Sequence, residues 1–177
     1  MKKYKLSAFD LKLALMEKYR FAKQHVVAEE CLDCDILADD GKLITEIEVK
    51  ITKSDLKAES KKMLYRKLKH DLYRTSKAWM IPNKFYFCVP SHLVEFTKEY
   101  AKELNPKYGV IEFDEKFIDI LPNRRYSNHE GYVRVVKRAG KLHDKYNLKF
   151  ARKIALRACT KSISLMQDIY KRKLKEV

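Results

Sequence analysis

The sequence has no apolar run that approaches the roughly 20 residues needed to cross a bilayer. Residues 1–6 are basic but carry no apolar core and no small-residue cleavage site, so we expect no secretory signal. The chain also lacks internal repeats, low-complexity tracts and a clear linker. These absences argue against a membrane protein and favour a cytoplasmic one.

Cysteine is scarce, with four residues at positions 31, 34, 88 and 159. Cys31 and Cys34 have the spacing of half a zinc site. A structural zinc needs a second pair of ligands, and the other two cysteines are far apart with no histidine at finger-like spacing. We therefore expect reduced thiols, as in a cytosolic protein, and no zinc.

Acidic residues are outnumbered, 24 Asp and Glu against 39 Lys and Arg, which gives a formal net charge of +15. A surplus of this size favours a polyanionic partner such as DNA, RNA or an acidic membrane surface. The length of 177 residues suits one domain, and 46% hydrophobic residues make global disorder unexpected. We expect residues 1–143 to form the domain and residues 144–177 to form a basic helical extension packed on it.

Periodicity predicts an α/β protein in which a mixed sheet is flanked by helices. Strand patterns fall at residues 25–28, 33–38, 42–51, 85–89, 108–113, 117–121 and 132–137. Helix patterns fall at residues 7–21, 56–73, 90–104 and 147–177. Ser7 and Ser54 are expected to cap the first two helices, and Asp40-Gly41 predicts a tight hairpin turn.

The hairpin around this turn carries the most informative charges of the chain. Side chains alternate along a strand, so Glu48 and Lys50 are expected on one face and Val49 on the other. The hairpin can bring Asp35 beside them, which gives two carboxylates and one ammonium on an otherwise apolar hairpin. Such a set can hold a divalent metal ion and an attacking water against a phosphodiester. The alternative is an ordinary same-face ion pair on a solvated strand.

Together these residues resemble the PD-(D/E)xK nuclease superfamily, closest to its MmcB-like and phage-encoded branch associated with DNA repair. The resemblance runs from about residue 21 to residue 143 and is carried by Asp35, the run Glu48-Val49-Lys50, and segments 51–56, 69–70, 82–90 and 137–143. One departure is that Cys34 precedes the first acid, where the superfamily has proline.

The resemblance implies an α/β/α core like that of restriction endonucleases and a site that uses Mg²⁺ or Mn²⁺. Asp35, Glu48 and the backbone carbonyl of Val49 would bind the metal, and Lys50 would orient or deprotonate the attacking water. The implied function is a DNA nuclease in repair, recombination or phage DNA metabolism, in a bacterial or phage-infected cell. A non-catalytic nucleic-acid-binding module is the alternative, and a homodimer is one assembly that the resemblance allows.

A further acid is expected near this site. Glu29 lies an even number of residues before Asp35 and shares its face if the chain stays extended. If a bulge or turn before Asp35 exchanges the two faces of the strand, Glu30 takes the place of Glu29. Glu17 on the first helix is a third option. Glu46 shares a face with Glu48 and is a candidate to support the site, but we favour a solvated strand residue.

Basic side chains outside the motif are candidates for contact with DNA, which we expect in preference to RNA. They are Lys53, Lys69, His70, Arg124, Arg125, Lys141 and His143. For His143 the alternative is a hydrogen-bonded surface histidine. The terminal helix carries further Lys and Arg residues that can follow a nucleic-acid backbone, with an affinity that falls steeply with salt.

Overall fold

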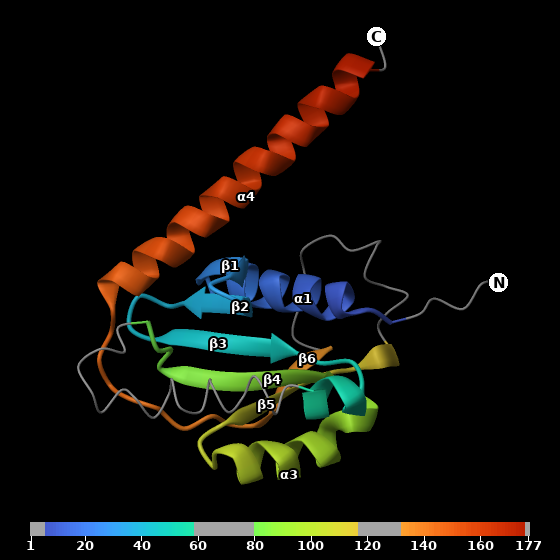
Figure 1. The fold of residues 1–177 in the computed structure, drawn as a ribbon, viewed down its shortest axis with the longest axis vertical. Helices are drawn as coiled ribbons and strands as arrows, with labels where there is room; N and C mark the ends of the chain where they lie inside the picture. Colours follow the sequence, from blue (N-terminus) through green and yellow to red (C-terminus); the bar gives the residue numbers. More distant parts are fainter. Residues whose placement is uncertain (1–5, 59–79, 117–131, 176–177) are drawn as a thin grey trace, which may run out of the picture.

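The computed structural model describes residues 6–58, 80–116 and 132–175. In this part of the chain six strands form one mixed sheet in sequential order (Figure 1). The strands are β1 (Val26–Cys31), β2 (Cys34–Asp39), β3 (Ile44–Val49), β4 (Lys84–Pro90), β5 (Gly109–Phe113) and β6 (Val133–Lys137). Strands β3, β4 and β5 run parallel to one another, whereas the β1–β2, β2–β3 and β5–β6 pairs are antiparallel.

Helices pack against this sheet, so the predicted α/β class is confirmed. They are α1 (Ala8–Glu17), which continues as a π-helical turn (Lys18–Ala22), α3 (Val94–Leu104), which follows a 3₁₀ turn (Ser91–Leu93), and α4 (Leu148–Lys175). A further helical stretch spans residues 53–58. None of the described helices combines the length and the apolar character needed to cross a membrane.

Ser7 and Asp10 fix the start of α1, as the sequence predicts. The Asp10 carboxylate accepts hydrogen bonds from the backbone N–H of Ser7 at 2.8 Å and from its hydroxyl at 2.6 Å. These bonds satisfy the backbone N–H and the hydroxyl of the N-cap residue, whose N–H has no partner within the helix. Leu11 and Leu15, four residues apart on one face of this helix, are fully buried against the sheet.

The two faces of the sheet are covered by different helices. Helix α1 packs on a cluster that includes Ile36, Ile47 and Val49, so the predicted inward face of β3 is confirmed. On a second cluster, Phe85 and Phe87 of β4 pack with α3. All of residues 85–90 are buried, as a short apolar run in a central strand predicts.

The second predicted cap was misplaced by two residues. The hydroxyl of Thr52, and not that of Ser54, accepts the N–H of Asp55 at 3.1 Å. A capping side chain lies three residues before the N–H that it satisfies, and helix 53–58 begins directly after Thr52. The rest of the predicted helix 56–73 and the predicted strand 117–121 lie outside the described residues.

Asn83 joins three parts of the fold. Its side chain is buried, its Oδ1 accepts the N–H of Ile44 at 2.9 Å, and its Nδ2 donates to the carbonyls of His143 at 3.1 Å and Lys145 at 2.9 Å. These bonds tie the start of β3 to the segment that leads into α4. The start of α4 is therefore held in register with the hairpin.

Helix α4 is docked on the sheet through its first half. Phe150 and Ile154 are buried against Leu37 and Ile44 of β2 and β3. Residues 162–168 are all exposed, and the helix projects away from the sheet (Figure 1). At 1.5 Å per residue the helix measures roughly 40 Å.

Candidate metal centre

The site residues lie on the β2–β3 hairpin, where the two strands are farthest from their turn. The turn itself forms at Asp39–Gly41 as predicted: Asp39 Oδ1 accepts the N–H of Gly41 at 2.9 Å, and Gly41 has a φ of 84°. Ile36 pairs with Ile47 in the register, so the preceding and following residues, Asp35 and Glu48, stand across from each other. The predicted convergence is therefore present.

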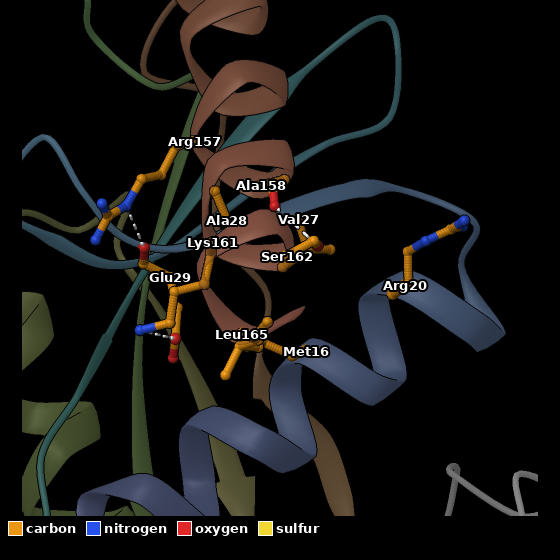
Figure 2. Close-up of a pocket in the computed structure, with 10 residues that line it drawn as sticks. All are labelled: Met16, Arg20, Val27, Ala28, Glu29, Arg157, Ala158, Lys161, Ser162 and Leu165. Atoms are coloured by element: carbon orange, nitrogen blue, oxygen red, sulfur yellow. Dashed lines mark hydrogen bonds and ion pairs between the residues drawn. The ribbon is translucent and has the colours of Figure 1, made fainter. Parts of the chain in front are cut away.

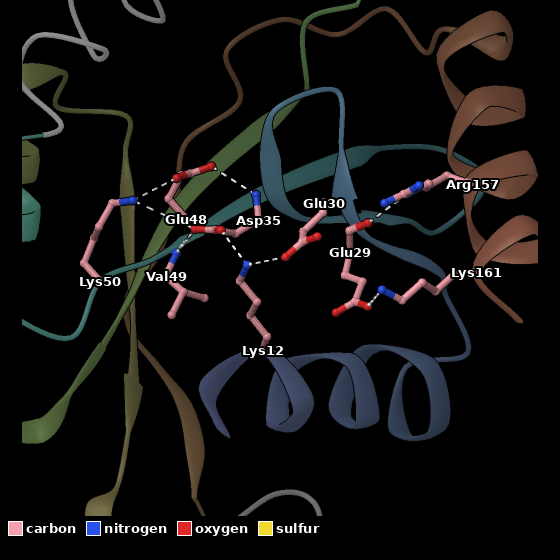
Figure 3. Close-up of polar contacts among 9 residues, drawn as sticks. All are labelled: Lys12, Glu29, Glu30, Asp35, Glu48, Val49, Lys50, Arg157 and Lys161. Carbon is pink, nitrogen blue, oxygen red and sulfur yellow. Dashed lines mark hydrogen bonds and ion pairs between the residues drawn. The ribbon is translucent and has the colours of Figure 1, made fainter. Parts of the chain in front are cut away.

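Each carboxylate is oriented by one backbone N–H. Val49 N–H donates to Asp35 Oδ2 at 2.9 Å, and Asp35 N–H donates to Glu48 Oε1 at 3.2 Å. Each second oxygen meets a lysine, with Lys12 Nζ 2.9 Å from Asp35 Oδ1 and Lys50 Nζ 3.1 Å from Glu48 Oε2. Lys50 Nζ also lies 3.9 Å from Asp35 Oδ2, so its ammonium faces both acids (Figure 3).

The environment favours charged forms despite partial burial. The side chain of Asp35 is 24% exposed and that of Glu48 is 3% exposed. Burial by itself raises the pKa of Asp35, but hydrogen bonds from Lys12 and Val49, with the charges of Lys12 and Lys50, outweigh it and lower this pKa. Burial likewise lowers the pKa of Lys12, and its contacts with Asp35 and Glu30 outweigh that effect and raise it.

Lys12 is the site residue that the sequence analysis did not find. It lies on α1, one residue after buried Leu11 and three before buried Leu15, which places it beside the apolar face of that helix. That position was its sole signal in the sequence. Its contact with Asp35 spans 23 positions of the chain and depends on how α1 packs on the sheet.

Glu29, the first choice for the additional acid, does not lie beside Asp35 as predicted. Glu29 does not meet Asp35, because its carboxylate pairs with Lys161 of α4 at 3.0 Å. Glu30 contacts Lys12 at 3.4 Å and so shares a cation with Asp35 (Figure 3).

The parity switch has a local cause. Positive φ values of 47°, 55° and 63° occur at Glu30, Leu32 and Asp33. The chain therefore turns before Asp35 and does not stay extended from residue 29. A turn at this place is the condition under which the sequence predicts Glu30, and not Glu29, as the additional acid. Cys31 and Cys34 pair across this turn and are not joined by a disulfide.

The other predicted acids lie elsewhere. Glu17 accepts a hydrogen bond from the Tyr132 hydroxyl at 3.1 Å. The prediction that Glu46 is solvated was wrong, because this residue is 1% exposed. On β3 its side chain is covered by the packing on the same side of the sheet as that of Glu48.

The candidate DNA contacts have mixed outcomes. Lys53 is exposed, with its ammonium 5.3 Å from the ring centroid of Phe96. Lys141 forms an exposed ion pair with Asp144 at 2.9 Å. His143 is 8% exposed and its Nε2 lies 3.0 Å from the Ile81 carbonyl, so it is hydrogen-bonded as the alternative expected, but buried and not at the surface. Lys69, His70, Arg124 and Arg125 lie outside the described residues.

The donor set suits a hard divalent cation. Among residues 6–58, 80–116 and 132–175, no group of three or more His, Cys, Asp or Glu side chains is placed to hold a metal ion. Mg²⁺ commonly uses only one or two carboxylates, with waters and substrate phosphates as its remaining ligands. Asp35 and Glu48 meet that requirement, and the two lysines at their second oxygens show that the site attracts positive charge.

Comparison with known proteins shows the fold alone. No family model and no curated protein matches this chain. Among solved structures, a protein of unknown function from Silicibacter pomeroyi is similar, with a TM-score of 0.56 and 16% sequence identity over 96% of each chain. The chain therefore shares its overall α/β fold with that protein.

Proposed function

We propose that this protein is a metal-dependent DNA nuclease that acts in repair, recombination or phage DNA metabolism. The observation that carries the proposal is the convergence of Asp35, Glu48 and Lys50, with Lys50 Nζ within 3.9 Å of both carboxylates. Two acids and a lysine on neighbouring strands are also what the resemblance to PD-(D/E)xK nucleases implies.

Each side chain has a defined role in this proposal. Asp35 and Glu48 would hold Mg²⁺ or Mn²⁺ through their carboxylate oxygens in place of the lysine ammonium groups, and the N–H groups of Asp35 and Val49 keep the two carboxylates oriented. A divalent cation supplies a water nucleophile at neutral pH and offsets charge on the phosphate. Lys50 would orient the attacking water and stabilise the negative charge that develops on the phosphoryl oxygens.

DNA as the substrate is supported by charge. The net charge of +15 favours a polyanion, and Lys149, Arg152 and Lys153 are exposed on the first turns of α4. Contacts of this kind bind phosphates regardless of sequence.

The test is cleavage of single-stranded, nicked, branched and duplex DNA by the purified chain with Mg²⁺ or Mn²⁺. We expect cleavage that EDTA abolishes and that falls about 100-fold or more in Asp35→Asn and Lys50→Met, because each removes electrostatic stabilisation of the transition state. Lys102→Met is the matched control for Lys50→Met, since it removes the same charge from an exposed position of α3. Cleavage that survives in both site variants contradicts the proposal.

A non-catalytic nucleic-acid-binding module is the second candidate. The observation that favours it is the pairing of Asp35 and Glu48 with Lys12 and Lys50, which neutralises the two acids without a metal. DNA binding that EDTA leaves unchanged, without cleavage of any of the four substrates, supports this candidate over the nuclease.

A further inference from the structure

A pocket of about 270 Å³ lies over the edge strand β1, between α1 and α4 (Figure 2). Its floor is apolar and is made by Met16 of α1, Val27 and Ala28 of β1, and Ala158 of α4. This volume is slightly below the range of about 300–1,000 Å³ that is usual for small-molecule sites. The pocket therefore has room for one small, largely apolar group.

The rim of the pocket is basic. Arg20 from the π-helical turn and Arg157 and Lys161 from α4 stand around it (Figure 2). Arg157 Nε donates to the backbone carbonyl of Glu29 at 3.4 Å, and Lys161 Nζ lies 3.0 Å from the Glu29 carboxylate. The lining contains three cations and one carboxylate, so the net positive charge of the rim favours an anionic ligand.

The pocket adjoins the candidate metal centre on two elements. Met16 lies one helical turn after Lys12 on α1, which is about 6 Å along the helix. On β1, Glu29 of the pocket directly precedes Glu30, and Glu30 contacts Lys12. A nucleic-acid strand advances about 3.4 Å per nucleotide along a duplex axis, so a strand crossing the metal centre reaches this pocket within a few nucleotides.

We propose that this pocket receives the base of an unpaired nucleotide close to the phosphodiester held at Asp35 and Glu48, and that Arg157 and Lys161 contact a flanking phosphate. This rests on the proposed nuclease function and specifies its substrate as single-stranded or locally unpaired DNA. A base has an apolar face that suits the pocket floor, and its backbone phosphate suits the basic rim. A paired base has to leave the duplex to enter such a pocket.

The first experiment measures binding of fluorescein-labelled oligonucleotides by anisotropy, using Asp35→Asn to prevent cleavage. The probes are a single-stranded 12-mer and matched 12-mers with one abasic nucleotide moved along the strand. Base stacking contributes about 1–3 kcal/mol, so we expect one abasic position to weaken binding about 5- to 150-fold. Equal affinity for every abasic probe overturns the proposal.

The second experiment fills the pocket. Ala158→Leu adds apolar volume at the floor and leaves every rim charge in place, and Thr160→Leu is the control at an exposed position of the same helix. We expect Ala158→Leu to bind the intact 12-mer as weakly as the protein without this substitution binds the most affected abasic probe. We expect no further loss of affinity when Ala158→Leu is tested with that abasic probe. Binding of the intact probe by Ala158→Leu at the level of Thr160→Leu overturns the proposal.

Cleavage by the unsubstituted chain with Mn²⁺ separates this inference from the proposed function. Equal cleavage of intact and abasic strands supports the proposed nuclease function and contradicts the binding of a base in the pocket. Base-dependent binding without any cleavage supports the pocket and contradicts the nuclease. Failure of all probes to bind overturns both.

Discussion

Removing the Lys12 ammonium is expected to tighten binding of a divalent cation at Asp35. Lys12 Nζ lies 2.9 Å from Asp35 Oδ1, and its side chain is 15% exposed. At this separation and an effective dielectric constant of about 20, the direct Coulomb attraction is on the order of 6 kcal/mol. Desolvation of both groups cancels most of this, and hydrogen bonds between charged groups contribute about 1.5–3 kcal/mol net.

A metal ion that binds Asp35 Oδ1 has to break the ion pair between Lys12 and Asp35. The free energy of metal binding is therefore less favourable by the net free energy of that ion pair. Since 1.4 kcal/mol corresponds to a factor of ten, Lys12→Met is expected to lower the dissociation constant for Mn²⁺ about 10- to 100-fold. Isothermal titration calorimetry of Mn²⁺ into the purified protein measures the effect directly.

Two variants control for other causes. Lys149→Met makes the same charge change at an exposed position of α4 and reports the long-range contribution. Glu30→Gln removes the second, exposed partner of Lys12, 3.4 Å away, and is expected to leave Mn²⁺ affinity unchanged or slightly weaker. If Lys12→Met binds Mn²⁺ no more tightly than Lys149→Met, the ion does not compete with Lys12 and this reasoning is refuted.

Three further predictions concern the scaffold. Asn83→Ala is expected to lower the free energy of unfolding by about 2–4 kcal/mol, because it removes several buried hydrogen bonds at once, and a loss under 1 kcal/mol in urea titrations would contradict this. The hydrogen bond from Arg134 lowers the pKa of Glu112, so this pair stabilises the fold above the ordinary glutamate pKa and stops doing so as pH falls through the lowered one. Arg134→Met should therefore lower the melting temperature at neutral pH and not in strong acid, and an equal loss at both would be inconsistent with the pair. Gly109→Ala should destabilise by about 1–3 kcal/mol, since a Cβ there would lie 2.3 Å from the Tyr86 ring, and unchanged thermal unfolding would exclude that clash.

Short-range features of this fold could be predicted from the sequence. The cap at Ser7, the turn at Asp39–Gly41 and the convergence of Asp35 with Glu48 depend on contacts between residues at most 13 positions apart, where strand alternation and turn chemistry decide the geometry. The predicted inward face of β3 is confirmed for the same reason.

Features that depend on helix packing could not be predicted in this way. Lys12 reaches Asp35 only because α1 lies across the sheet, and no local pattern links the two residues. The choice between Glu29 and Glu30 depended on a positive φ at Glu30, a residue type that rarely adopts one. The burial of His143 follows from its bonds to the segment around Asn83, 60 positions earlier in the chain.

The most direct test of the central claim is a crystal of the protein soaked in Mn²⁺, with data collected for anomalous scattering. We predict a peak within coordination distance of a carboxylate oxygen of Asp35 and one of Glu48, about 2–2.3 Å for a hard divalent cation bound by carboxylates, with Lys12 and Lys50 moved off the oxygens that the ion takes. Absence of that peak at saturating Mn²⁺, with both lysines still in contact with the two carboxylates, would contradict the metal centre.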